Sequence, residues 1–152
     1  MTNKVSEFLR KHDSCEDGLE WAVENCKTME DVWNTAKPEW LIWIATRGGV
    51  LPEMDLHRFA CWSVRQVWDL LTDERSRNAI EVKEKWTEGQ ATDKELTAAG
   101  AAARAAVRDA AGAAACDAAW SATGSATRAA AWNASRKKQA QYIRDTFTPN
   151  FK

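Results

Sequence analysis

The sequence of 152 residues lacks the features that mark several large classes of protein. It has no run of 18 or more apolar residues, which a membrane-spanning helix would need, and its polar start MTNKVSEFLRKH lacks the apolar centre of a signal peptide. No segment alternates apolar and polar residues over a convincing length, so strands are not predicted. We therefore expect an all-α protein that is soluble and cytoplasmic and has no contact with a membrane.

The usual signatures of catalysis are also missing. The chain has two histidines, and it has no Gly-rich phosphate loop, nucleophile elbow or metalloprotease helix. Acid–base chemistry would depend on carboxylates whose clustering the sequence does not reveal. We predict a protein that is not an enzyme and that uses no cofactor.

The four cysteines are scattered and lack the dense spacing of a secreted disulfide scaffold. The sharpest metal pattern pairs His12 with Cys15, three residues later. A second pair, His57 with Cys61, has a spacing of four, and both spacings place the two side chains on one helix face. Two such pairs brought together would suit zinc. Buried cysteines beside half-exposed histidines are commoner, so we predict no metal site and keep these four residues as the alternative.

Large and small apolar side chains occupy different halves of the chain. Seven of the nine tryptophans precede residue 90, whereas alanine fills 20 of the 37 positions from Ala98 to Ala134. Alanine favours helix but buries little apolar area. Residues 1–95 carry 19 acidic and 13 basic side chains, and residues 96–152 carry 3 and 8. We expect the two halves to attract each other and to form a single domain, 1–152.

The first 90 residues contain several signals that start short helices. Ser14 to Asp17 and Thr28 to Asp31 resemble capping boxes, and Pro38 suits the first position of a helix. Residues 40–45 are apolar almost all round and are predicted to be the most buried piece. A further capping box, Thr92 to Glu95, precedes the alanine-rich region.

From Thr92 to Phe147 no proline interrupts the chain. One continuous helix would be about 80 Å long, which exceeds the size of a compact domain of this length. We expect a break near 121–125, around Gly124, and two helices over 92–121 and 126–147; a single bent helix is the alternative. The predicted fold is a compact helical bundle in which short Trp-rich helices (1–90) pack against a long Ala-rich C-terminal helix or helical hairpin (92–147).

Bulky and basic side chains in the alanine-rich half are the candidates for partner binding. The predicted contact residues are Trp120, Trp132, Arg136, Lys137, Lys138 and Arg144. On an ideal helix Trp120 and Trp132 lie about 120° apart, so the two side chains do not both fit into one narrow contact between helices. Tryptophan is also enriched at interface hot spots. Packing within the domain is the commoner use of such a tryptophan. A small basic cluster in a chain of net charge -1 gives little support for nucleic-acid binding.

The run from Phe59 to Val82, the run from Gly89 to Leu96 and the alanine tract together resemble a loosely defined set of alanine-rich all-helical proteins of bacteria and phages. The most specific part is Leu71 to Arg77. Members of this set are often labelled hypothetical or immunity proteins. The resemblance implies a small inhibitor that binds a toxin or a host-defence component, and it assigns no active-site residue. We therefore expect a protein that occludes a macromolecular partner; the alternative is a structural protein that forms a homo-oligomer through its alanine-rich seam.

Overall fold

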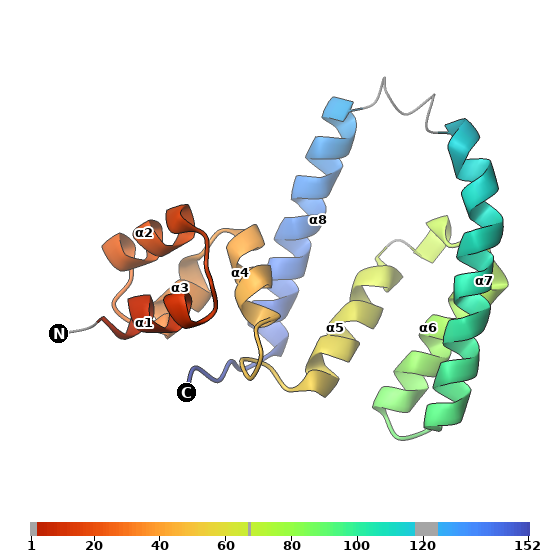
Figure 1. Ribbon diagram of the computed structural model, residues 1–152, viewed down its shortest axis with the longest axis horizontal. Helices are drawn as coiled ribbons and strands as arrows, with labels where there is room; N and C mark the ends of the chain where they lie inside the picture. Colours follow the sequence, from red (N-terminus) through yellow and green to blue (C-terminus); the bar gives the residue numbers. More distant parts are fainter. Residues whose placement is uncertain (1–2, 67, 118–124) are drawn as a thin grey trace. The chain divides into compact units, whose positions relative to one another are not determined.

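The computed structural model describes the chain except for residues 1–2, 67 and 118–124, and it describes side chains except for those and the rest of 107–132. The described residues form eight α-helices and one short 3-10 helix, with no strand (Figure 1). The elements are α1 (Lys4–Lys11), α2 (Glu16–Asn25), α3 (Met29–Thr35), α4 (Pro38–Ala45), α5 (Glu53–Arg65), η1 (Trp68–Leu70), α6 (Glu74–Thr87), α7 (Asp93–Asp117) and α8 (Ser125–Thr146). The all-α class predicted from the sequence is confirmed.

The chain divides into two compact units, each with its own set of contacts. Unit 1 comprises Met1–Pro52 and Trp132–Lys152, and unit 2 comprises Glu53–Ala131. The alanine-rich region is thus shared, since α7 belongs to unit 2 and most of α8 belongs to unit 1. The prediction of a single domain stays a prediction.

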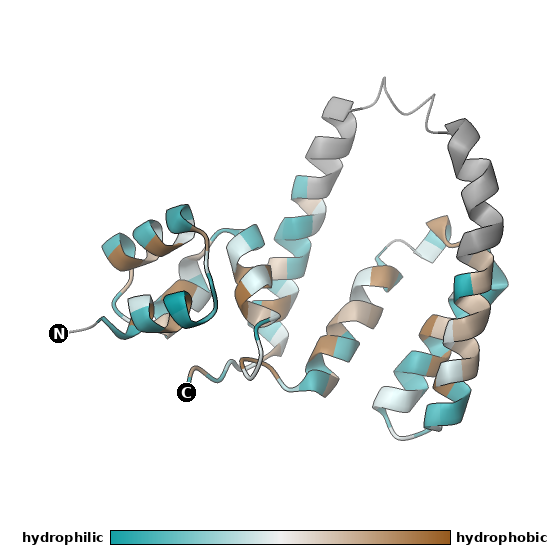
Figure 2. Cartoon of the chain, in the orientation of Figure 1, coloured by the Kyte–Doolittle hydropathy of each residue, from teal (hydrophilic) through white to brown (hydrophobic). Residues whose placement is uncertain are grey.

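The short helices of unit 1 begin where local chemistry starts them. The Asn3 side chain accepts a hydrogen bond from the Val5 N–H at 3.0 Å and caps α1. Thr28 and Asp31 form the predicted capping box of α3, and Pro38 occupies the first turn of α4. Apolar positions alternate with hydrophilic ones along these helices (Figure 2). Helices α1 to α3 therefore offer an apolar face to a shared core, whereas α4 is apolar on most of its sides.

The core of unit 1 is closed and contains large side chains. The most completely buried ones in the described part of the chain all belong to this unit: Val5, Val32, Leu41, Ile44, Val50 and Ile143. The C-terminal tail joins this core, because the Asn150 N–H donates to the Val50 carbonyl at 2.8 Å. The Phe151 ring lies edge-on to Phe8, with ring centroids 5.5 Å apart. Both ends of the chain therefore stabilise the same unit.

Unit 2 is built around a helical hairpin. Helices α6 and α7 follow each other in the sequence, are joined by a short turn and pack against each other (Figure 1). Gly89 ends the turn after α6 with a φ of 74°, a conformation that favours glycine. The Thr92 hydroxyl accepts from the Glu95 N–H at 3.2 Å, so the capping box predicted at the start of α7 is present. The predicted break near 121–125 falls on residues 118–124 and the start of α8, largely outside the described residues.

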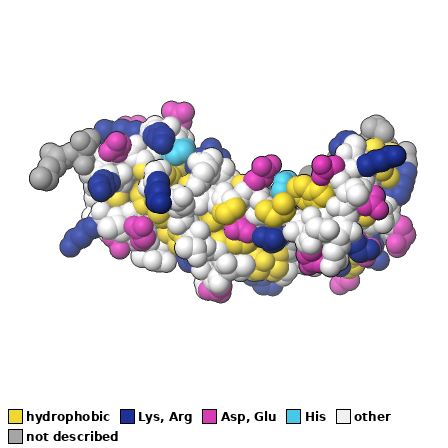
Figure 3. All heavy atoms as spheres, turned by 90° about the horizontal axis from the view of Figure 1, so that it is seen from below, with side chains coloured by type: hydrophobic (Ala, Val, Ile, Leu, Met, Phe, Trp, Pro, Cys, Tyr) yellow, Lys and Arg dark blue, Asp and Glu magenta, His cyan; other side chains and the backbone are white. Residues whose placement is uncertain are grey.

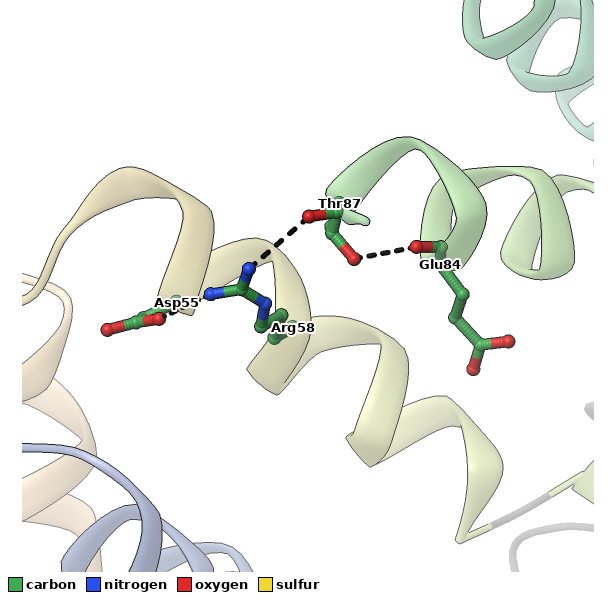
Figure 4. A network of polar contacts seen from close by, with 4 residues as sticks. All are labelled: Asp55, Arg58, Glu84 and Thr87. Atoms are coloured by element: carbon green, nitrogen blue, oxygen red, sulfur yellow. Dashed lines mark hydrogen bonds and ion pairs between the residues drawn. The ribbon is translucent and has the colours of Figure 1, made fainter. Parts of the chain in front are cut away.

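Polar side chains connect α5 to α6. The Arg65 guanidinium makes two hydrogen bonds to the Glu84 carboxylate, at 2.8 and 2.6 Å. Figure 4 shows Arg58 bonded to the Asp55 carboxylate at 2.9 Å and to the Thr87 carbonyl oxygen at 3.3 Å. The α5–α6 contact therefore relies on guanidinium groups as well as on apolar packing.

Candidate partner-binding pocket

Unit 1 contains an apolar pocket of about 210 Å³ between its first four helices. The pocket is lined by Leu9, Ser14, Cys15, Gly18, Trp21, Val32, Ala36, Glu39, Trp40, Trp43 and Ile44. Three of these residues are half-buried tryptophans, while Cys15 and Glu39 are exposed, so the pocket opens to solvent. The buried side chains of Leu9, Val32, Ala36 and Ile44 belong to the core of unit 1 and line the pocket from within.

A glycine lets α2 approach the tryptophans of α4 closely. A Cβ placed on Gly18 would lie 3.5 Å from the Trp40 indole and 3.1 Å from the Cys15 sulfur. The Trp21 and Trp40 rings meet with centroids 5.3 Å apart and planes inclined by 43°. Gly18 therefore sets the width of the pocket at this point, and a larger side chain here would project into it.

Cations hold two of the tryptophan rings. The Lys37 ammonium lies 4.0 Å from the centroid of Trp40, and the Arg47 guanidinium lies 4.7 Å from the centroid of Trp43. The Arg47 Nε also donates to the Trp43 carbonyl oxygen at 3.1 Å, which ties it to the end of α4. Such cation–π contacts restrict the rings while leaving them half-buried.

The polar lining of the pocket includes an unpaired hydroxyl. The Ser14 Oγ is buried and makes no hydrogen bond to any residue that the structure describes. The sequence predicted this side chain as the cap of the second helix, and that prediction is wrong. Helix α2 begins one residue later, with Cys15 at its N-cap position and no side-chain capping bond. Ser14 is among the residues that line the pocket, but its hydroxyl oxygen is itself buried.

The helix α2, which forms one side of the pocket, is rich in carboxylates. Between His12 and Cys26 the sequence holds five carboxylates and no lysine or arginine. On α2, Asp17 lies four residues before Trp21 and Glu24 lies three residues after it. Both carboxylates therefore flank Trp21 on the helix surface. On the adjoining face of α2 a groove is lined by Arg10, Glu16, Leu19, Glu20, Val23 and Glu24, with Val23 43% exposed. First-turn carboxylates stabilise the start of α2. Among the residues that line the pocket itself, Glu39 is the acidic one, and the cations of Lys37 and Arg47 lie on two of its rings.

The basic residues predicted to bind a partner have different environments. Lys137 and Lys138 are exposed on α8, and Arg136 is half-buried. Arg144 is half-buried, and its guanidinium donates to the Trp33 carbonyl at 2.9 Å and to the Ala36 carbonyl. Burial lowers the pKa of Arg144. This side chain caps the C-terminus of α3 across more than a hundred residues, and a contact between Arg144 and a partner stays a prediction.

The two tryptophans predicted as contact points cannot be located in the same way. Trp120 and the side chain of Trp132 lie outside the described residues. Their role in binding stays a prediction.

The histidine–cysteine pairs lie in different units. His12 follows the end of α1 and packs on Phe8, with ring centroids 4.6 Å apart, and Cys15 lies beyond a turn at the start of α2. His57 lies 3.7 Å from the Glu53 carboxylate. Within the described part of the chain no three histidine, cysteine or acidic side chains are grouped closely enough to hold a metal ion.

Burial of the thiols varies among the cysteines. Cys26 and Cys61 are buried and Cys15 is exposed, while the Cys116 side chain is outside the described residues. Burial raises the pKa of the Cys61 thiol. Cys15 is therefore the accessible thiol among the three that are described.

Sequence patterns did not reveal this pocket. Residues 40–45 were expected to be the most buried piece, yet Trp40 and Trp43 are half-buried, while Leu41, Ile44 and Ala45 are buried. A short helix that is apolar all round cannot bury every side in a unit of four short helices and part of α8. The excess of tryptophan in the first half of the sequence was the available signal. The positions of Gly18 and Ser14 beside these rings depend on tertiary packing.

Charged side chains of both signs are interspersed over the face displayed in Figure 3. None of the helices in the described residues is long and apolar enough to cross a membrane. Comparisons with models of protein families, with curated proteins and with solved structures found no match to this chain. The geometry of the pocket therefore carries the functional argument.

Proposed function

We propose that this chain is a non-enzymatic protein-binding protein that inhibits a macromolecular partner by covering its surface. A toxin or a component of a defence system is the class of partner that the resemblance to immunity proteins implies, and the cytoplasm is the proposed site of action. The observation that carries the proposal is the tryptophan-lined pocket of about 210 Å³, open to solvent and set over a closed core. Interface hot spots are rich in tryptophan and centre on pockets that an anchor side chain fills.

The proposed binding surface has more than one part. The pocket supplies the anchor point, and the acidic side chains of α2 supply a charged rim that discriminates between partners. Lys137 and Lys138 on α8, together with Trp120 and Trp132, form the second contact region that we propose from the sequence. In this proposal the Trp-rich short helices and the Ala-rich helices form one bundle that presents both parts.

The test is affinity capture from the organism that carries the gene, with a matched pair of variants. Gly18→Leu fills the pocket beside Trp40 and replaces a glycine within α2, a change that favours helix. Gly48→Leu makes the same chemical change where an added Cβ meets nothing within 4 Å. A partner held by the wild type and by Gly48→Leu, but lost by Gly18→Leu, supports the proposal.

Two results count against it. If no protein is enriched by the wild-type chain, the binding function fails. If Gly18→Leu retains a partner as well as the wild type does, the pocket is not the binding site. Trp120→Ala and Trp132→Ala, tested in the same capture, decide whether the second region contributes.

Self-assembly is the second candidate function, and unit 2 provides the observation that favours it. Among its described residues, Trp62, Trp68 and Trp86 are half-buried and Leu70 is 77% exposed. Ala98 and Ala101 are exposed on α7 and add little bulk there. A second copy could approach such a surface closely. Light scattering over a range of protein concentrations separates the two functions, because a monomer at every concentration contradicts self-assembly.

A further inference from the structure

We propose that the pocket of unit 1 receives the Leu70 side chain of a second copy of this chain. The inference rests on the pocket proposed above as the binding site, and it names what covers that pocket when no other partner is bound. Three observations carry it: an open apolar pocket, an exposed leucine on a tethered turn, and opposite charges beside the two.

The pocket suits one uncharged apolar side chain. Its walls are mainly tryptophan rings and aliphatic side chains, and Glu39 is the one acidic residue among them. An apolar protein cavity of about 150 Å³ accommodates benzene, which has more heavy atoms than the leucine side chain. At about 210 Å³ this pocket therefore has space for a leucine side chain and part of the adjoining backbone.

Leu70 is the large apolar side chain that is most exposed in the described part of the chain, at 77%. It ends the short helix η1, whose first residue is Trp68. The guanidinium groups of Arg65 and Arg77 lie 4.0 and 5.5 Å from the centroid of the Trp68 ring. Arg77 also donates to the Leu71 carbonyl oxygen at 2.5 Å. These contacts tether the turn, so less conformational freedom is lost when Leu70 enters a pocket.

The charges beside the leucine and beside the pocket are complementary. Asp69 precedes Leu70, is exposed and forms no ion pair with any residue that the structure describes. On the α4 side of the pocket, the Lys37 and Arg47 cations lie on two of the tryptophan rings, and neither is paired with a described carboxylate. The opposite side, α2, carries carboxylates. Leu70 therefore docks with Asp69 toward α4.

The contact joins two different surfaces, so it does not end with a dimer. Each copy offers one pocket in unit 1 and one Leu70 in unit 2. When two copies bind, one pocket and one leucine remain free, and further copies add until a ring closes or a chain grows. An outside partner that uses the same pocket has to displace the second copy.

The experiment measures self-association of the full chain by sedimentation velocity and light scattering. The protein concentration is raised to about 1 mM, because a contact of this size is weak. Leu70→Asp removes the apolar side chain, and Gly18→Leu fills the pocket beside Trp40. Each variant is expected to weaken self-association at least about tenfold, as loss of a central anchor does. Circular dichroism checks that each variant is folded.

Two control variants match these changes. Val23→Asp places a carboxylate at the other exposed large apolar side chain, which is 43% exposed on α2. Gly48→Leu adds a side chain where an added Cβ meets nothing within 4 Å. Both controls are expected to associate as the wild type does.

A mixture of the two disrupted variants provides the decisive measurement. The Gly18→Leu copy still supplies Leu70, and the Leu70→Asp copy still supplies an open pocket. We expect each variant alone to be monomeric and their equimolar mixture to form a one-to-one heterodimer that grows no further. The inference is overturned if the wild type is monomeric at every concentration, if Leu70→Asp associates as the wild type does, or if the mixture stays monomeric.

Reversal of the charge beside the leucine tests the direction of docking. Asp69→Lys is expected to weaken self-association about threefold at low salt, and added salt should reduce this difference. Self-association that Asp69→Lys leaves unchanged or strengthens would overturn the inference, because the pairing with Lys37 and Arg47 would then be absent.

Failure of this inference and failure of the proposed function give different results. A wild-type chain that is monomeric at every concentration but still captures an outside partner keeps the proposed function and overturns this inference. Self-association that is lost in Leu70→Asp and restored in the mixture supports the inference even when no outside partner is captured, and the inhibitory function then fails alone.

Discussion

The two units differ in how their cores are closed. Unit 1 buries side chains as large as Leu41, Ile44 and Ile143, whereas the buried apolar residues described in unit 2 are Cys61, Ala99 and Ala106. Alanine forms helix readily but brings little apolar area out of water. A long alanine-rich helix therefore does not by itself complete a core, and short helices with bulky side chains can.

Different interactions consequently stabilise the two units. Unit 1 relies on close packing, which also keeps the walls of its pocket in place. Unit 2 adds polar links, such as the Arg65–Glu84 pair and the Trp86 indole N–H bonded to Asp93 at 2.7 Å. We infer that the rigid unit carries the recognition site.

The largest expected effect comes from truncating matched isoleucines. Ile143→Ala in unit 1 removes a side chain that is 0% exposed and should cost about 2–5 kcal/mol of unfolding free energy. Ile80→Ala in unit 2 truncates a half-buried side chain and should cost less than about 2 kcal/mol. Urea unfolding followed by the indole NMR signals of Trp33 and Trp86 reports on the two units separately. Equal losses would contradict the contrast between a closed and an open core.

The next effect concerns the cap at the end of α3. Arg144→Met removes the guanidinium that bonds the Trp33 and Ala36 carbonyls while keeping an apolar stem, and should cost about 1–3 kcal/mol in unit 1. Arg144→Lys keeps the charge but cannot reproduce the two-pronged donor, so it should restore only part of the stability. The same urea experiment on the Trp33 signal checks both variants. A neutral effect of Arg144→Met would show that the cap does not stabilise the unit.

A smaller effect is expected from the ion pair that links α5 to α6. A double-mutant cycle with Arg65→Ala and Glu84→Ala should give a coupling of about 0.2–1 kcal/mol, because both side chains are partly exposed to water. The Glu84 carboxylate bonded to Arg65 has its pKa lowered. Raising the salt concentration should reduce the coupling measured from the Trp86 signal. A coupling of zero would leave unit 2 without this polar link.

The smallest effect is a pH dependence of unit 2 that comes from the cap of α6. The Arg75 side chain and backbone N–H lower the pKa of Asp73 to about 2, and this carboxylate caps α6. The stability it contributes is present above the pKa of the unfolded chain and is lost as the pH falls through about 4 to about 2. Because Asp73 is only half-buried, the effect is small. Asp73→Asn should reduce the pH dependence of the Trp86 signal in this range, and Glu84 and Glu95, whose pKa values are also lowered, should supply the remainder. An unchanged profile would show that the cap does not contribute.

Local features of the fold could be predicted from the sequence because local chemistry determines them. The capping boxes of α3 and α7 need only residues three apart, and Pro38 acts at its own position. The prediction that Ser14 caps α2 was wrong because the helix begins one residue later, with Cys15 at its N-cap position. Signals of this kind locate helices to within about a residue or two.

The site could not be predicted in the same way. The pocket depends on Gly18 of α2 lying against Trp40 of α4, and the burial of Arg144 depends on carbonyls more than a hundred residues away. No spacing of residues in the sequence predicts that Gly18 lies against Trp40 or that Arg144 reaches these carbonyl groups. The excess of tryptophan in the first half was visible, but packing decides which indoles line a pocket.

Cys15 provides the most direct test of the central claim that the pocket of unit 1 is a binding site. Its thiol is exposed and lines the pocket, so an occupant should shield it from alkylation. In a Cys116→Ser background, the rate at which N-ethylmaleimide modifies Cys15 can be followed by mass spectrometry with and without the partner that the wild-type chain captures. We expect a saturating concentration of this partner to slow the reaction severalfold, and a protein that the chain does not capture to have no effect. An unchanged rate of Cys15 modification under saturating partner would contradict the account.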